Sequence, residues 1–222
     1  MAQRAIRPVL EARTPAFESP PADWGFRYRD LIAAVILIPA AAAALVSTSP
    51  VPSDSGLALG FDVIAWLLFL AGAALRFWAT LYVGGRKRDM IVADGPYSLC
   101  RHPLYLASFL MSVSAGLFMK SPGVVGAALV AAGAYLLTTV PQEEAALARL
   151  HPRSWAEYAA RVPRVVPSRR GWRTPARITV DIGSLRDEAA RASRWVLLPL
   201  LAQVASHLRE QPWWPHVLHT IW

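Results

Sequence analysis

The sequence has few charged residues and a single cysteine. Only 17% of its 222 residues are Asp, Glu, Lys or Arg, against about 25% in a typical soluble domain. Because Cys100 is alone, an internal disulfide and a metal site built from several cysteines are both excluded. Hydrophobic residues make up 55% of the chain, the mean hydropathy is +0.33, and the apolar residues are bunched into long runs. This composition indicates a membrane protein.

The first 24 residues lack the apolar run of a signal peptide and contain four prolines, so we expect an irregular or partly ordered arm. The formal net charge of +8 also raises the possibility of nucleic-acid binding. The arginines, however, flank apolar runs, as they do on the cytoplasmic side of membrane proteins. We therefore expect the lipid bilayer, and not nucleic acid, as the partner of the basic surface.

Four apolar runs cover residues 31–46, 57–83, 104–119 and 123–140. The second is long enough to cross about 30 Å of hydrocarbon, and the third and fourth are somewhat short for a full crossing. Only the turn "KSPG" separates the last two, so they should form a tight antiparallel hairpin. The predicted fold is all-α, a polytopic membrane helical bundle with about four transmembrane helices.

The distribution of basic residues predicts how the bundle is oriented in the membrane. Five arginines precede the first run, twelve follow the fourth, and the loop 84–103 holds Arg86, Lys87, Arg88 and Arg101. The linker between the first two runs has no Lys or Arg, and the hairpin turn has Lys120 alone. Because positive charge is retained on the cytoplasmic side, we predict an integral protein of the inner or cell membrane with both termini cytoplasmic.

The C-terminal part contains one more apolar stretch, residues 195–205, which is too short to span. We expect an amphipathic interfacial helix on the inner leaflet, with Ser184 as its N-cap, and a fifth short membrane segment is the alternative. The predicted organisation is an N-terminal arm (1–28), the first two transmembrane helices (29–83), a core with the polar motifs (84–170) and a C-terminal extension (171–222).

Charged residues stand at both ends of the predicted hairpin. Arg101 and His102 precede its first helix, and Glu143 and Glu144 follow its second. A hairpin returns the chain to the side it left, so these residues should meet at one depth. They could form a plain salt-bridge cluster that fixes topology, or one wall of a binding site. Arg76, inside the second run, is either an interfacial anchor or a buried group facing a site.

The ordered motifs narrow these alternatives. The pattern G-P-Y-x-x-x-R-H-P-x-Y begins at Gly95 and ends at Tyr105, the Glu pair follows about forty residues later, and "VPRVVP" comes last. Together, over residues 92–167, they resemble the isoprenylcysteine carboxyl methyltransferase family, which is related to the membrane phospholipid methyltransferases.

This resemblance implies S-adenosyl-L-methionine as cofactor and a lipid-like or amphiphilic acceptor at the cytoplasmic face. Glu144 and Arg164 are the catalytic candidates, with Arg164 near an anionic acceptor group. Charge-assisted pairing of the cofactor's carboxylate and ammonium agrees with the basic and acidic residues present. The resemblance places the cofactor among Gly95, Tyr97, Arg101, His102, Tyr105, Leu106, Glu143 and Glu144.

Two other functions remain open. An NADPH-dependent membrane reductase of the sterol-reductase type is similar in its C-terminal part but usually has more preceding spans. A non-catalytic protein on the same scaffold is the other. We expect no metal site, because His216 and His219 have no further ligands nearby in sequence. The sequence leaves the oligomeric state, and the atom that receives the methyl group, open.

Overall fold

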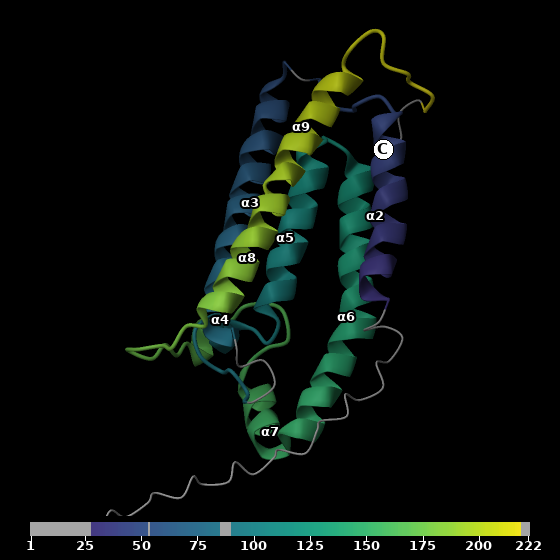
Figure 1. Ribbon diagram of the computed structural model, residues 1–222. Coiled ribbons are helices and arrows are strands. Elements are labelled where there is room, and N and C mark those ends of the chain that lie inside the picture. The colour runs from purple at the N-terminus through teal and green to yellow at the C-terminus, as the bar shows by residue number, and fades with distance from the viewer. Residues whose placement is uncertain (1–27, 53, 85–89, 219–222) are drawn as a thin grey trace, which may run out of the picture.

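The computed structural model describes residues 28–52, 54–84 and 90–218 (Figure 1). These residues form helices, joined by loops with one isolated bridge between Ser47 and Leu218. The predicted N-terminal arm, the cluster Arg86, Lys87 and Arg88, and His219 lie outside the described residues. The helices are α2 (Arg29–Leu45), α3 (Gly56–Val83), α4 (Pro96–Leu99), α5 (Pro103–Phe118), α6 (Pro122–Leu150), α7 (Pro152–Arg161), η1 (Arg169–Gly171), α8 (Ile182–Trp195) and α9 (Leu197–Arg209).

The four predicted apolar helices are all present, as α2, α3, α5 and α6. Of these, α3 and α6 are long and apolar enough to cross a membrane, and the other two are shorter. Ser55 caps α3 by accepting a hydrogen bond from the Ala58 amide, and Ser121 caps α6 by accepting one from Val124. The all-α prediction is confirmed for the described residues, although α6 continues through Pro141 to Leu150 and not only to residue 140.

The tightest packing lies between α3 and α5. A Cβ added at Gly72 would lie 2.7 Å from Met111 Cγ and 2.8 Å from the Ala107 carbonyl oxygen, so only glycine allows this approach. Phe69 and Phe118 each meet Trp66 edge-on, with ring centroids 6.0 and 5.1 Å away. Phe69, Met111 and Phe118 belong to the hydrophobic core cluster of the bundle.

The outward faces of the bundle are apolar. Large aliphatic side chains stay exposed on four helices, which is unusual for a soluble protein. We call this surface the apolar belt; among its residues are Val35 and Ile38 on α2, Val63, Leu67 and Leu70 on α3, Leu129, Val130 and Leu137 on α6, and Leu200, Leu201 and Val204 on α9. Its extent, with the two long apolar helices, indicates a membrane protein.

The C-terminal helices differ from the prediction. α8 and α9 run lengthwise along α3 and α5 (Figure 1). At the end of α9, Arg209 donates from Nε to the Ser47 carbonyl (3.1 Å) and from Nη1 to that of Met119 (2.7 Å). One face of α9, with Pro199, Ala202 and Ser206, is buried against the bundle, whereas its Leu200, Leu201 and Val204 side chains stay exposed. The predicted placement of this helix on the inner leaflet stays a prediction. Asp181, and not Ser184, is the N-cap of α8.

This arrangement separates the two ends of the described chain. α2 begins where the Tyr135 hydroxyl donates to Asp30 at 3.4 Å, whereas Val217 and Leu218 donate to the Val46 carbonyl at the other end of α2. The last described residues thus lie at the end of the bundle opposite to the start of α2 (Figure 1). The predicted placement of both termini on the cytoplasmic side stays a prediction, since the termini lie outside the described residues.

Candidate functional site

The hairpin of α5 and α6 brings the predicted basic and acidic residues together. Arg101 Nη1 lies 3.1 Å from Glu144 Oε1, and His102 Nε2 lies 3.2 Å from the same oxygen. The Tyr105 hydroxyl donates to Glu143 Oε2 at 2.8 Å. The predicted meeting of the two pairs at one depth is confirmed.

The loop before α5 is held in a fixed shape. Gly95 has a φ of +59°, and an added Cβ would lie 2.5 Å from the Tyr82 ring, so this position requires glycine. The Tyr158 hydroxyl on α7 donates to the Tyr97 carbonyl at 2.9 Å. Pro103 then starts α5, where a missing N–H costs least. Together these features fix the direction in which His102 and Tyr105 project.

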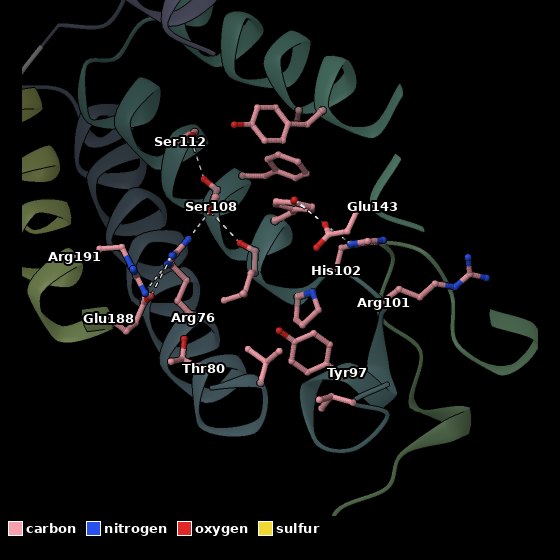
Figure 2. A pocket seen from close by; sticks show the side chains of 18 of the residues that line it. Arg76, Thr80, Tyr97, Arg101, His102, Ser108, Ser112, Glu143, Glu188 and Arg191 are labelled. Carbon is pink, nitrogen blue, oxygen red and sulfur yellow. Dashed lines mark hydrogen bonds and ion pairs between the residues drawn. The ribbon is translucent and has the colours of Figure 1, made fainter. Parts of the chain in front are cut away.

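Glu144 collects three basic side chains. Besides Arg101 and His102, it accepts from Arg164 Nη2 at 2.6 Å, and its side chain is 9% exposed. Arg101 also donates to the Val162 carbonyl at 2.8 Å and to the Ala159 carbonyl, and in Figure 2 its side chain extends away from Arg76 and Glu188. Glu144 and Arg101 therefore tie the hairpin to α7 and the segment after it.

Beside this cluster lies a cavity of about 750 Å³. Its polar end is formed by aromatic and ionisable side chains from α5, α6 and α7. Among the predicted site residues, Gly95, Leu106, Glu144 and Arg164 are not in its lining. The roles assigned to all of these residues stay predictions. The predicted residues that do line the cavity are Tyr97, Arg101, His102, Tyr105 and Glu143.

Burial shapes the chemistry of His102. The residue is 6% exposed, and its ring stacks on Tyr105 with the ring centroids 5.5 Å apart. Desolvation lowers the pKa of His102, and the neighbouring Glu143 and Glu144 only partly oppose this effect. The Glu144 carboxylate in turn raises the pKa of Arg164. A neutral imidazole beside Glu143 is therefore the state favoured near neutral pH.

A second polar group lines the same cavity. Arg76 donates from Nε to Glu188 at 2.7 Å and from Nη1 to the Ser108 hydroxyl at 2.8 Å, and Arg191 lies 2.9 Å from Glu188 (Figure 2). Arg76 has a side chain only 15% exposed and lines the cavity, so it is a largely buried group and not an exposed anchor, and its role at a site stays a prediction. Glu188 was missed, because no sequence signal links it to a partner 112 residues away.

Residues 63–149 match the isoprenylcysteine carboxyl methyltransferase family. This match covers most of α3, the loop with Arg101 and His102, and the hairpin that carries Glu143 and Glu144. It agrees with the geometry of the cluster and with the motifs that surround it. This match and the relatives described below support an isoprenylcysteine carboxyl methyltransferase-like family for the chain.

Two relatives of this methyltransferase-like chain are named for metal resistance, and a third is named as a methyltransferase. The chain is 35% identical to the cobalt-zinc-cadmium resistance protein CzcN of Cupriavidus metallidurans over 55% of this chain and 56% of that one. It is 29% identical to the nickel-cobalt-cadmium resistance protein NccN of Alcaligenes xylosoxydans xylosoxydans, over 63% and 65%. Protein-S-isoprenylcysteine O-methyltransferase B of Arabidopsis thaliana is 32% identical over 43% and 48%.

The chain thus spans between about half and two thirds of the length of these relatives. No solved structure matches it. Two relatives are named for metal resistance, yet within residues 28–52, 54–84 and 90–218 no group of three His, Cys, Asp or Glu side chains could hold a metal ion. The family supports a membrane methyltransferase.

Proposed function

We propose that this protein transfers a methyl group from S-adenosyl-L-methionine to a lipid-like or amphiphilic acceptor at the cytoplasmic face of a membrane. The observation that carries the proposal is the cluster of His102, Tyr105 and Glu143, on the hairpin that matches the family, opening into a cavity of about 750 Å³. That volume lies in the range of cofactor and small-molecule sites, about 300–1,000 Å³.

The lining suits the chemistry of the cofactor. S-adenosyl-L-methionine carries an ammonium, a sulfonium, a carboxylate and a flat adenine. Glu143, with a side chain 27% exposed, and Asp30 both line the cavity and are suited to the cationic groups. The rings of Tyr105 and Trp155 offer flat faces to adenine or sulfonium. Arg101 and His102 are the proposed partners of the carboxylate.

When bound, the cofactor supplies an electrophilic methyl group on its sulfonium. The chain's contribution is to bind, orient and exclude water, which can lower a barrier by about 7–11 kcal/mol at best. The Tyr105 hydroxyl fixes Glu143, and the packed Tyr158 fixes the loop before α5. A neutral His102 can accept a proton from an ammonium or thiol acceptor, whereas a carboxylate or free amine needs no base.

We propose roles in the reaction for Glu144 and Arg164 as well. The pair lies beside the cavity and holds the segment after α7 against the hairpin. Arg164 has a side chain 50% exposed, so it is accessible to an anionic acceptor that approaches from outside. In this proposal Glu144 positions Arg101, His102 and Arg164, and Arg164, outside the cavity lining, contacts the acceptor before its head group enters the cavity.

The proposed setting is a bilayer around the apolar belt. α2, α3, α5 and α6 cross it, and the end with His102, Glu143 and the Arg-rich α7 faces the cytoplasm. The cofactor can then arrive from water, and an amphiphilic acceptor from the membrane.

Calorimetric titration of the purified protein tests the proposal. S-adenosyl-L-methionine or its demethylated product should bind, and Glu143→Ala should weaken binding at least tenfold, because it removes the carboxylate offered to the ammonium. His102→Ala should also weaken it. Glu157→Ala, on the exposed face of α7, is the matched control and should stay within twofold of the unchanged protein.

The same titration with NADPH separates the competing function. NADPH binding without S-adenosyl-L-methionine binding would replace the proposal with a reductase. Absence of heat with either cofactor would sink the enzymatic proposal. Incubating membranes with cofactor labelled in its methyl group, followed by analysis of the labelled product, then identifies the acceptor.

A further inference from the structure

The cavity has a second polar wall that the proposed cofactor contacts do not use. It is formed by α3, α5 and α8, and we call Arg76, Ser108, Glu188 and Arg191 the Arg76 cluster. Figure 2 shows it across the cavity from His102 and Glu143, with Arg76 placed between Glu188 and Ser108. α8 lies outside the residues that match the family, so half of this cluster is supplied by the C-terminal extension.

The charges of the Arg76 cluster do not balance. It contains two guanidinium groups and one carboxylate, so it carries one excess positive charge. Glu188 is 2% exposed and is shared by both arginines. Charged groups at the border of a hydrocarbon region are expensive unless paired. An anion in the cavity would complete the pairing, and Arg191, with a side chain 45% exposed, is positioned to meet it.

Beyond the Arg76 cluster the cavity becomes apolar. Its wall there comes from α2, α5, α6 and α9, whose outer surfaces, apart from that of α5, belong to the apolar belt. A polar wall followed by an apolar arm matches a molecule with a charged head and a hydrocarbon tail. The residues of the apolar arm are Leu37, Phe109, Ala128, Ala131, Ala132 and Leu198.

The Arg76 cluster also lies close to the proposed cofactor contacts. Ser108 follows Tyr105 by three residues on α5, so both side chains project from the same face of that helix. Both line the cavity. A head group bound at the cluster is therefore held within the chamber where methyl transfer is proposed to occur.

We propose that Arg76 and Arg191, oriented by Glu188, bind the anionic head group of the acceptor while its tail occupies the apolar arm. This inference rests on the proposed function, and it assigns acceptor selection to α8. Carboxylate and phosphate head groups share the chemistry that two guanidinium groups recognise. Neutral or cationic head groups lack it.

Quenching of tryptophan fluorescence tests this assignment. Trp195 lines the cavity, and the Arg76 Cζ atom lies 5.7 Å from its ring centroid, so a brominated tail in the apolar arm would quench it. The probes are brominated 16-carbon amphiphiles with carboxylate, phosphate, alcohol or trimethylammonium heads, added to the full chain in nanodiscs of zwitterionic lipid. Trp195→Phe identifies the signal, because the specific quenching should vanish in that variant.

Anionic probes should saturate at concentrations at least tenfold lower than the alcohol or the ammonium. A preference for carboxylate, for phosphate or for both supports the proposed role of the Arg76 cluster and identifies its ligand class. Equal quenching by all four heads overturns the proposal. Arg191→Gln should weaken anion binding about tenfold, whereas Arg194→Gln, an exposed residue of α8 outside the cavity lining, should leave it unchanged.

Glu188→Gln should change anion affinity in the opposite direction to Arg191→Gln. It therefore distinguishes a role of the cluster in anion binding from a purely structural role. It keeps the shape of the side chain but removes the competing negative charge, so anion binding should tighten; weaker binding overturns the charge argument. Titrating S-adenosyl-L-methionine into the same samples keeps the two proposals apart. If the cofactor binds and anions show no preference, only this inference fails; if anions bind and the cofactor does not, the proposed function fails.

Discussion

At the scale of single residues, the protonation of His102 is expected to make stability depend on pH. His102 is 6% exposed, and burial lowers the pKa of its imidazole below the ordinary value of 6.5. Between pH 6.5 and the lowered pKa, the unfolded chain binds a proton that the folded protein does not. Stability should therefore fall as pH drops below about 6.5, by at most about 1.4 kcal/mol per pH unit for one group.

Thermal unfolding at pH 7.5, 6.5 and 5.5 measures this effect. The melting temperature should drop toward pH 5.5, and the drop should be smaller in His102→Asn, which cannot take up the proton. His207→Asn, at an exposed position on α9, should behave like the unchanged protein. An equally steep drop in His102→Asn would show that another group is responsible.

The residue scale also shows where sequence reasoning stops. The sequence alone predicts that four charged residues lie close together, because a short hairpin returns the chain to the side that it left. These residues are Arg101, His102, Glu143 and Glu144. The Arg76 cluster could not be predicted, since nothing local pairs Arg76 with Glu188. Which of two adjacent glutamates faces the cavity was also out of reach: Glu143 does, whereas Glu144 binds three basic side chains beside it.

At the scale of elements, α9 is fastened by a buried arginine. Arg209 is 2% exposed and donates to the carbonyls of Ser47 and Met119, so its loss leaves both oxygens without this donor. Arg209→Met should cost about 1–3 kcal/mol. The loss should appear as a lower melting temperature and as faster proteolysis within α8 and α9. Arg194→Met is the control, and equal effects of the two substitutions would rule out the fastening role.

Elements were predictable where length and apolarity decide them. α2, α3 and α5 begin and end within two residues of the apolar runs, because bilayer thickness and N-terminal caps leave little choice. The packing of α8 and α9 along α3 and α5 was not predicted, and the reason is physical. An amphipathic pattern states that one face is apolar, and lipid head groups or a groove between α3 and α5 satisfy it equally.

At the scale of the whole molecule, α8 and α9 run along the length of the bundle. Together they cover 182–209, roughly 40 Å of helix at 1.5 Å per residue. α9 contributes to the apolar belt, and Trp214 Nε1 donates to the Leu45 carbonyl at the end of the bundle far from His102. If the bundle axis crosses the bilayer, the two ends of the described chain lie on opposite sides.

Labelling of single cysteines in intact and opened cells measures this topology. Ser154→Cys, exposed on α7, should react with a membrane-impermeant maleimide only after the cells are opened. Trp213→Cys, at a position 68% exposed beyond α9, should react in cells whose inner or cell membrane is intact, provided that the maleimide can reach the outer face of that membrane. The native Cys100 gives little background, because it is 1% exposed and burial raises its pKa to about 11. Labelling of both positions only in opened cells would place α9 on the cytoplasmic side, and it would remove the lipid-facing role of α9 on which the length of the apolar arm depends.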